Sequence, residues 1–152
     1  MGRTATIVLG LLLTLFVAAG CTNRTGSYCA QLRSDQHRLH QLAAQAGRDG
    51  KRGDVLTEAL HVFTELQQRA PANIRPDYDL LVSAYSNLRD ALTKAGVDPG
   101  SFRPGHRPAG LSSGEYQSIR QAALALDSDR VRHAAQRIED HAQQVCHVDL
   151  RR

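Results

Sequence analysis

IRPDYDLLVSAYSNLRDALTKA, the segment Ile74–Ala95, carries the most regular pattern of the 152-residue chain and decides its fold class. Apolar side chains recur there at alternating steps of four and three residues, at Ile74, Tyr78, Leu81, Tyr85, Leu88, Leu92 and Ala95. Such a stripe lies on one face of an α-helix and packs lengthwise against nearly parallel helices. Pro76 either marks the start of this helix or bends it, and Gly96 is suited to end it.

Four further segments have helical periodicity: Ser27–Ala46, Val55–Arg69, Glu115–Leu126 and Arg130–Cys146. Residues suited to cap their N-termini are Ser27, Asp54, the capping-box pair Ser112 and Glu115, and the run Asp127-Ser128-Asp129. The last of these predicts a break or kink before the final segment. No segment alternates with a period of two, so we expect no sheet. The sequence therefore predicts an all-α fold, an antiparallel up-down helical bundle of about four helices with a broken last helix.

The expected buried stripes can be read from the first and last of these segments. In the first, the stripe comprises Tyr28, Leu32, Leu39, Leu42, Ala43 and Ala46, and Asp35 lies off it. In the last, it comprises Val131, Ala134, Ala135, Ile138, Ala142 and Val145. These two sets are the expected contribution of the terminal helices to the core.

The loop 96–111 is expected to be the least regular part of the fold, because it combines several proline and glycine residues with polar ones. Phe102 lies within it, between Arg103 and Arg107. An exposed aromatic ring beside positive charges could bind a partner or a lipid headgroup. The alternative is that the ring packs over the end of the bundle.

The N-terminal stretch Ile7–Cys21, IVLGLLLTLFVAAGC, follows the basic residue Arg3 and has the layout of a secretory signal peptide. It is too short for a membrane-spanning helix, which needs about 20 apolar residues. A soluble secreted protein would normally have alanine, not Gly-Cys, at the cleavage site. The residues Val17–Cys21 (VAAGC) instead resemble the lipobox of bacterial lipoproteins.

This resemblance implies cleavage before Cys21 and attachment of a diacylglycerol to its sulfur, with further acylation such as palmitate. Two or three acyl chains hold a protein on a membrane durably. We therefore expect a signal peptide over residues 1–20 that is removed, a lipidated Cys21 with a polar tether over 21–27, and a helical bundle domain over 28–150. The expected location is the extracytoplasmic face of the cell membrane.

The chain has three cysteines, and their positions support the same interpretation. Exported proteins occupy an oxidising compartment, so Cys29 and Cys146 are natural disulfide partners. An even number of helical passes would bring these two residues, at the start of the first helix and the end of the last, to the same end of the bundle. Cys21 is then the remaining cysteine, which the lipid would modify.

The charge pattern argues against a nucleic-acid partner. The net charge of +4 is spread along the chain and is not clustered with aromatic residues. We expect membrane attachment through the lipid on Cys21, with an envelope protein or a wall polymer as the candidate partner.

Several histidine and carboxylate residues are candidate metal ligands. Glu58 and His61 have the E-x-x-H spacing of carboxylate-bridged di-iron bundles, but such sites need two of these motifs and two more glutamates. The other candidates are His37 with His40, His133 with His141, Glu139, Asp140 and His147 beside Cys146. Surface histidines are the simpler interpretation, so no metal or other cofactor is predicted. No G-x-S-x-G or S-x-x-K motif is present, so no catalytic residue and no enzyme activity are predicted.

The pattern as a whole resembles small all-helical lipoproteins of unknown function, with paired N- and C-terminal cysteines, from high-GC Gram-positive bacteria. The resemblance rests on Val17–Cys21, Tyr28-Cys29, the Ala70-Pro71-x-x-Ile74 junction and the Ile138–Cys146 segment. Two functions follow as hypotheses. The first is a non-catalytic module that binds a partner in the cell envelope; the second is a bundle that binds a small ligand or a metal. A well-formed internal pocket with polar groups would favour the second, and a filled core with an exposed apolar loop patch the first.

Overall fold

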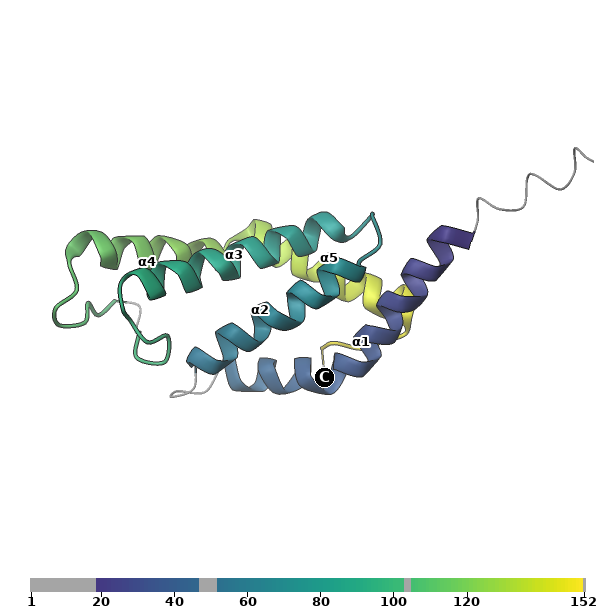
Figure 1. Cartoon of the computed structure of the whole chain (residues 1–152), viewed down its shortest axis with the longest axis horizontal. Coiled ribbons are helices and arrows are strands. Elements are labelled where there is room, and N and C mark those ends of the chain that lie inside the picture. Colours follow the sequence, from purple (N-terminus) through teal and green to yellow (C-terminus); the bar gives the residue numbers. More distant parts are fainter. Residues whose placement is uncertain (1–18, 47–51, 103–104, 152) are drawn as a thin grey trace, which may run out of the picture.

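The computed structural model describes residues 19–46, 52–102 and 105–151, apart from the side chains of residues 19–23, 46 and 52–54. This part of the chain is helical and contains no strand (Figure 1). The helices are α1 (Ala19–Ala46), α2 (Arg52–Arg69), α3 (Arg75–Lys94), α4 (Ser113–Leu126) and α5 (Asp129–Cys146). The predicted all-α class is confirmed.

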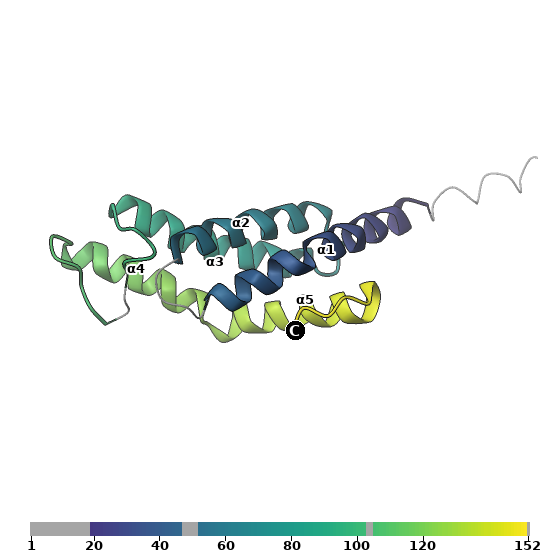
Figure 2. The same ribbon diagram turned by 90° about the horizontal axis from the view of Figure 1, so that it is seen from below.

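The helices pack as a bundle around α3, which contacts α2, α4 and α5, while α1 packs against α2 and α5. Consecutive helices run back and forth along the long axis, and α4 and α5 together form one bent pass beside α3 (Figures 1 and 2). The predicted up-down bundle with a broken last helix is therefore confirmed.

Both ends of α3 follow from local sequence signals. Pro76 lies in the first turn, where its missing N–H costs no hydrogen bond, so it marks the start of the helix and does not bend it. At the other end Gly96 adopts a φ of 62°, in the left-handed region that favours glycine. The N–H of Val97 donates to the carbonyl of Leu92 at 3.0 Å, and the N–H of Gly96 to that of Thr93 at 3.0 Å. These two bonds form a Schellman motif that satisfies the last carbonyls of the helix.

Two of the predicted N-caps are present. Ser112 and Glu115 form the capping box of α4, with bonds of 3.2 Å from the Glu115 N–H to the Ser112 hydroxyl and 2.9 Å from the Ser112 N–H to the Glu115 carboxylate. Ser128 caps α5 by accepting from the N–H of Val131 at 3.4 Å. The break between α4 and α5 is therefore produced by a new helix start, as predicted.

The other two predicted caps were wrong. Ser27 lies inside α1, where its hydroxyl donates to the carbonyl of Arg24 at 3.0 Å. The helix begins at Ala19, so the segment 21–27, predicted as a polar tether, has a helical backbone. No proline interrupts this segment, and the single Gly26 lowers helix propensity without ending the helix. Likewise α2 begins at Arg52, which places Asp54 within the helix.

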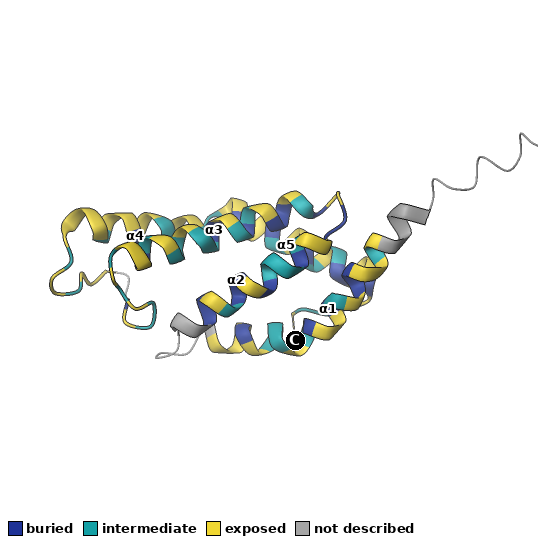
Figure 3. Ribbon diagram, in the orientation of Figure 1, coloured by how far each residue is buried: buried dark blue, intermediate teal, exposed yellow. Residues whose placement is uncertain are grey.

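The core consists of two clusters of buried side chains (Figure 3). The larger joins α1, α2, α3 and α5, and its fully buried members include Tyr28, Leu32, Leu66 and Tyr78. The smaller lies at the other end of the bundle and comprises Leu56, Leu92, Phe102 and Ile119. Phe102 is only 6% exposed, and its ring centroid is 6.1 Å from that of Tyr116. Of the two alternatives for this loop residue, packing over the bundle end is therefore the correct one.

Three stripe assignments were wrong. The predicted stripe of α1 includes Ala43, which is exposed because the buried face of the helix passes through Leu42. Asp35 was placed off the apolar stripe of α1, yet it is buried and accepts a hydrogen bond from the Gln31 side chain at 2.8 Å. Its position continues the four-three spacing of Leu32, so the geometry of the helix buries it despite its charge. Val145 was placed on the stripe of α5, yet it is 45% exposed. The buried face of α5 passes through Ala142 and Cys146 instead.

The structure brings Cys29 and Cys146 to disulfide-bonding distance, with their Cα atoms 5.1 Å apart. Both sulfurs belong to the larger core cluster, where α1 and α5 meet. The topology and the cysteine positions therefore agree in the way that the sequence predicts.

The predicted signal peptide lies almost wholly outside the described residues, which begin at 19, and the side chain of Cys21 is not described. The predicted lipidation therefore stays a prediction. Among the helices of the described ranges, none combines the length and apolar character needed to cross a membrane.

Candidate ligand pocket

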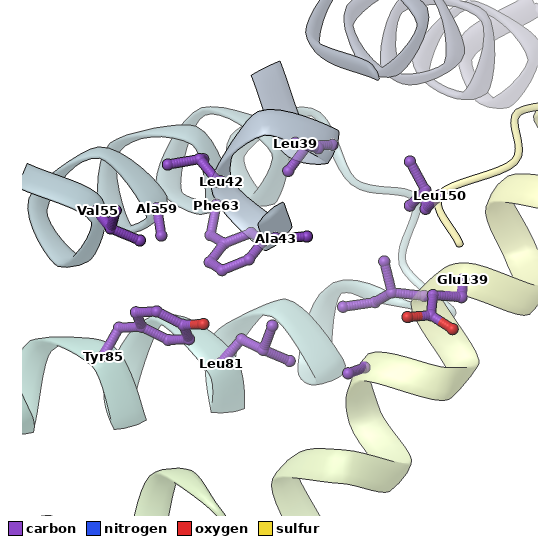
Figure 4. A pocket seen from close by; sticks show the side chains of 12 residues that line it. Leu39, Leu42, Ala43, Val55, Ala59, Phe63, Leu81, Tyr85, Glu139 and Leu150 are labelled. Carbon is purple, nitrogen blue, oxygen red and sulfur yellow. The ribbon is translucent and has the colours of Figure 1, made fainter. Parts of the chain in front are cut away.

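An apolar pocket of about 200 Å³ lies between α1, α2, α3 and α5, within the larger core cluster (Figure 4). Its lining residues come from five parts of the chain: Leu39, Leu42 and Ala43 from α1, Val55, Ala59 and Phe63 from α2, Leu81 and Tyr85 from α3, Ala135, Ile138 and Glu139 from α5, and Leu150 from the C-terminal tail. A cavity of about 150 Å³ with similar walls holds one benzene molecule. The pocket is therefore large enough for a single ring or a group of about six carbons.

The pocket exists because small residues meet where three helices come together. Val55, Ala59 and Phe63 are spaced four residues apart, so they lie on one face of α2. The alanine of that row faces the space also bordered by Ala43 and Ala135. Protein interiors normally fill such a space with longer side chains. Three short alanine side chains border it instead, of which Ala59 is buried and Ala43 is exposed, so the space is open on the side of α1.

An aromatic pair forms one wall. The rings of Phe63 and Tyr85 pack edge to face, with centroids 5.1 Å apart. Figure 4 shows the Tyr85 hydroxyl directed toward the space between the helices. Burial raises the pKa of Tyr85, so the hydroxyl stays protonated at neutral pH and can donate or accept a hydrogen bond.

The one charged side chain in the wall is the carboxylate of Glu139, whose side chain is 34% exposed. It accepts a hydrogen bond from the Arg151 Nε at 2.9 Å. Leu150, the residue before that arginine, is another lining residue of the pocket (Figure 4). The pocket thus has an apolar interior and an ionic contact beside it.

This arrangement is suited to binding an apolar group. The described lining residues include no serine, cysteine, histidine or lysine that could act as a nucleophile. Tyr85 and Glu139 can orient a ligand, and the aliphatic side chains can bury its apolar part.

The sequence-based metal candidates are dispersed over the structure. Glu58 is paired with Arg38, and His61 approaches Glu65 at 3.7 Å. His40 contacts the carbonyl of Asp149 at 3.0 Å. His133 contacts the Gln136 side chain at 3.2 Å, and the ring centroids of His141 and Tyr28 are 5.8 Å apart. Glu139 and Asp140 each form an ion pair with Arg151 at 2.9 Å. Within the described ranges, no three His, Cys, Asp or Glu side chains are grouped so that they could hold a metal ion.

A second polar cluster lies near the disulfide and away from the pocket. The hydroxyls of Tyr28 and Tyr78 form a buried hydrogen bond of 2.9 Å, and their rings pack edge to face. Burial raises the pKa of Tyr28 to about 12. His141 packs against Tyr28, its Nε2 is buried without a hydrogen-bond partner, and burial lowers its pKa. Tyr28 and Tyr78 are part of the larger core cluster, and His141 lies partly buried at its edge.

Two features of the structure were missed in the sequence. The first is the C-terminal tail, which was expected only to end the domain; the alternation of Val148 and Leu150 after the last helix was the available signal. The second is the pairing of buried Asp77 in α3 with Arg137 in α5. Those two residues are 60 positions apart, and no local pattern connects them.

Comparison with protein-family models, with curated proteins and with solved structures gave no significant match.

Proposed function

We propose that this protein is a lipid-anchored protein of the extracytoplasmic membrane face whose bundle binds a small apolar ligand in the pocket between α1, α2, α3 and α5. The observation that carries the proposal is the open apolar space at the Ala43, Ala59 and Ala135 junction. Ala43 is exposed and Ala135 partly exposed, so water can reach this space. A ligand that fills it removes apolar side-chain surface from water, which contributes about 25 cal/mol per Å².

The binding test uses benzene and hexan-1-ol, which match the pocket in size and lack charge. A ligand that binds only the folded state raises its stability by RT ln(1 + [L]/Kd). We expect millimolar concentrations of either compound to raise the melting temperature of the full chain. Chemical shifts of the Ala43, Ala59 and Ala135 methyl groups should change in the same titration.

A pocket-filling variant provides the matched control. Ala59→Leu adds three carbons inside the pocket, so it should abolish the ligand-induced rise in melting temperature. Ala44→Leu makes the same change at an exposed position of α1 and should leave the rise intact. If the Ala59→Leu protein responds to benzene as the unaltered chain does, the ligand binds elsewhere and the proposal is wrong.

The anchor is tested separately. The lipobox Val17–Cys21 supports acylation of Cys21. Cells given labelled palmitate should incorporate the label into the chain and not into its Cys21→Ser variant. Incorporation into both would overturn the assignment of Cys21.

The envelope interaction module predicted from the sequence stays a hypothesis. Its expected contact residue, Phe102, is buried in the smaller core cluster. The exposed loop patch that would have favoured this hypothesis over ligand binding is therefore not centred on Phe102.

A further inference from the structure

The C-terminal tail folds back over the pocket and is fixed at successive residues. Val148 is buried, and its N–H donates to the carbonyl of Ala142 at 3.0 Å. The carbonyl of Asp149 accepts from the Gln36 side chain at 2.9 Å. The tail is thereby held along α1 and α5 up to the residues that reach the pocket.

Leu150 and Arg151, which follow Asp149 in the tail, present two different chemical groups to the pocket. The Leu150 side chain lines the pocket and packs against the larger core cluster. The Arg151 guanidinium donates from Nε to Glu139 and from Nη2 to Asp140, both at 2.9 Å. An apolar group and a cation, one residue apart, thus contact the apolar wall and the carboxylates beside it.

We propose that the ligand of the pocket is a small apolar cation, an ammonium or guanidinium group that carries a short alkyl chain or a single ring, and that Leu150-Arg151 takes its place in the unliganded protein. This inference rests on the proposed function. The ligand's apolar part would occupy the pocket, and its charged end would replace Arg151 at Glu139.

Charge at the pocket selects this ligand over a neutral or anionic one of equal size. Two carboxylates, Glu139 and Asp140, bind a single guanidinium, so a second cation is attracted to them. An anionic ligand would have to place its charge near Glu139 and would be repelled. Because Glu139 and Asp140 are 34% and 52% exposed, solvent weakens this preference, and we expect roughly a tenfold difference in affinity, not more.

The test compares three six-carbon compounds on the purified full chain by calorimetric titration: hexylammonium, hexan-1-ol and hexanoate. We expect hexylammonium to bind about tenfold more tightly than hexan-1-ol, and hexanoate to bind most weakly. Glu139→Gln, which keeps the shape of the side chain, should remove the advantage of hexylammonium and leave hexan-1-ol within twofold.

A second variant tests the competition by the tail. Arg151→Gln removes the internal cation and keeps Leu150, so hexylammonium should bind several-fold more tightly, with hexan-1-ol little changed. Thermal melting of both variants controls for folding. Arg151 is exposed and Glu139 is partly exposed, so neither change should lower the melting temperature by more than a few degrees.

The outcomes separate the two proposals. Equal binding of all three compounds, or tightest binding of hexanoate, would overturn the cation inference and leave the proposed pocket function standing. Failure of all three compounds to bind would overturn both. An affinity for hexylammonium that is unchanged in both Glu139→Gln and Arg151→Gln would show that the charged end does not reach these residues.

Discussion

Reduction of the Cys29–Cys146 bond should remove a large part of the stability of the fold. The two residues are 117 positions apart, so the bond closes most of the folded chain into one loop. The loop-closure relation gives an entropy of about 16 cal/mol/K for this length, which is about 5 kcal/mol at 25 °C. Small domains have a total stability of 5–15 kcal/mol, so the loss would be a third or more of it.

The assay is equilibrium denaturation in urea, with and without reductant, of the full chain carrying Cys21→Ser so that only one cysteine pair remains. Reduction should lower the free energy of unfolding by about 5 kcal/mol and the melting temperature by roughly 15 °C. It should also increase the slope of the free energy against urea concentration, because an unfolded chain without the crosslink exposes more surface.

A double variant isolates the bond from its setting. Cys29→Ala with Cys146→Ala should be destabilised at least as much as the reduced chain, and reductant should have no further effect on it. Equal urea midpoints for the oxidised and reduced chain, with two thiols titrating after unfolding in both, would show that the bond does not form in the protein.

Three further outcomes test the buried polar groups. Asp77→Ala should lower the free energy of unfolding in urea by about 2 kcal/mol, because the buried carboxylate pairs with Arg137 and lies in the first turn of α3. An unchanged urea midpoint in Arg137→Ala would contradict that pairing. Burial lowers the pKa of His141, so the unfolded chain binds more protons below about pH 6.5 and stability falls on acidification. His141→Leu should flatten the dependence of the melting temperature on pH between 7 and 5, and the same change at exposed His133 should not. Burial raises the pKa of Tyr28 to about 12. The protonated phenol therefore contributes stability that is complete below about pH 10 and is lost as the pH rises toward 12. Tyrosinate absorbance that rises at pH 10 before any loss of helical circular dichroism would refute this.

Helix ends could be predicted where a few adjacent residues determine them. Ser112 with Glu115, Ser128, and Gly96 after the α3 stripe act within one turn, so the sequence contains the whole interaction. The starts of α1 and α2 could not be placed in this way. Ser27 has the chemistry of a cap, but a cap forms only where the preceding residues leave the helix, and here they continue it.

Burial of Asp35 was missed for a different reason. Its spacing from Leu32 and Leu39 places it on the buried stripe, whereas its charge favours an exposed position unless a partner is present. Gln31, one turn earlier, was a visible partner that could satisfy the carboxylate inside the protein. A polar residue at a core position with a partner four residues away is therefore compatible with the stripe.

The pocket could not be predicted from any one helix. Ala43, Ala59 and Ala135 each read as ordinary apolar residues of their own stripes, and the space arises only because the three helices bring them together. The position of the tail was equally hidden, since Arg151 pairs with Glu139 and Asp140, which precede it by 12 and 11 positions. Sequence patterns predict which face of a helix is buried, whereas the volume left inside depends on how the faces meet.

The disulfide also connects the stability of the bundle to the proposed ligand. Cys146 ends α5 and is followed directly by the tail, and its carbonyl accepts from the Arg33 side chain of α1 at 3.0 Å. We expect that breaking the bond loosens the end of α5 from which the tail extends to Leu150 and Arg151. If these two residues compete with a ligand, reduction must have two opposite effects. The reduced chain must be less stable, and the fraction of it that is still folded must bind hexylammonium more tightly. A tail that serves only as part of the core would predict the opposite, a fall in both quantities, so the sign of the change in affinity distinguishes a competing tail from a structural one.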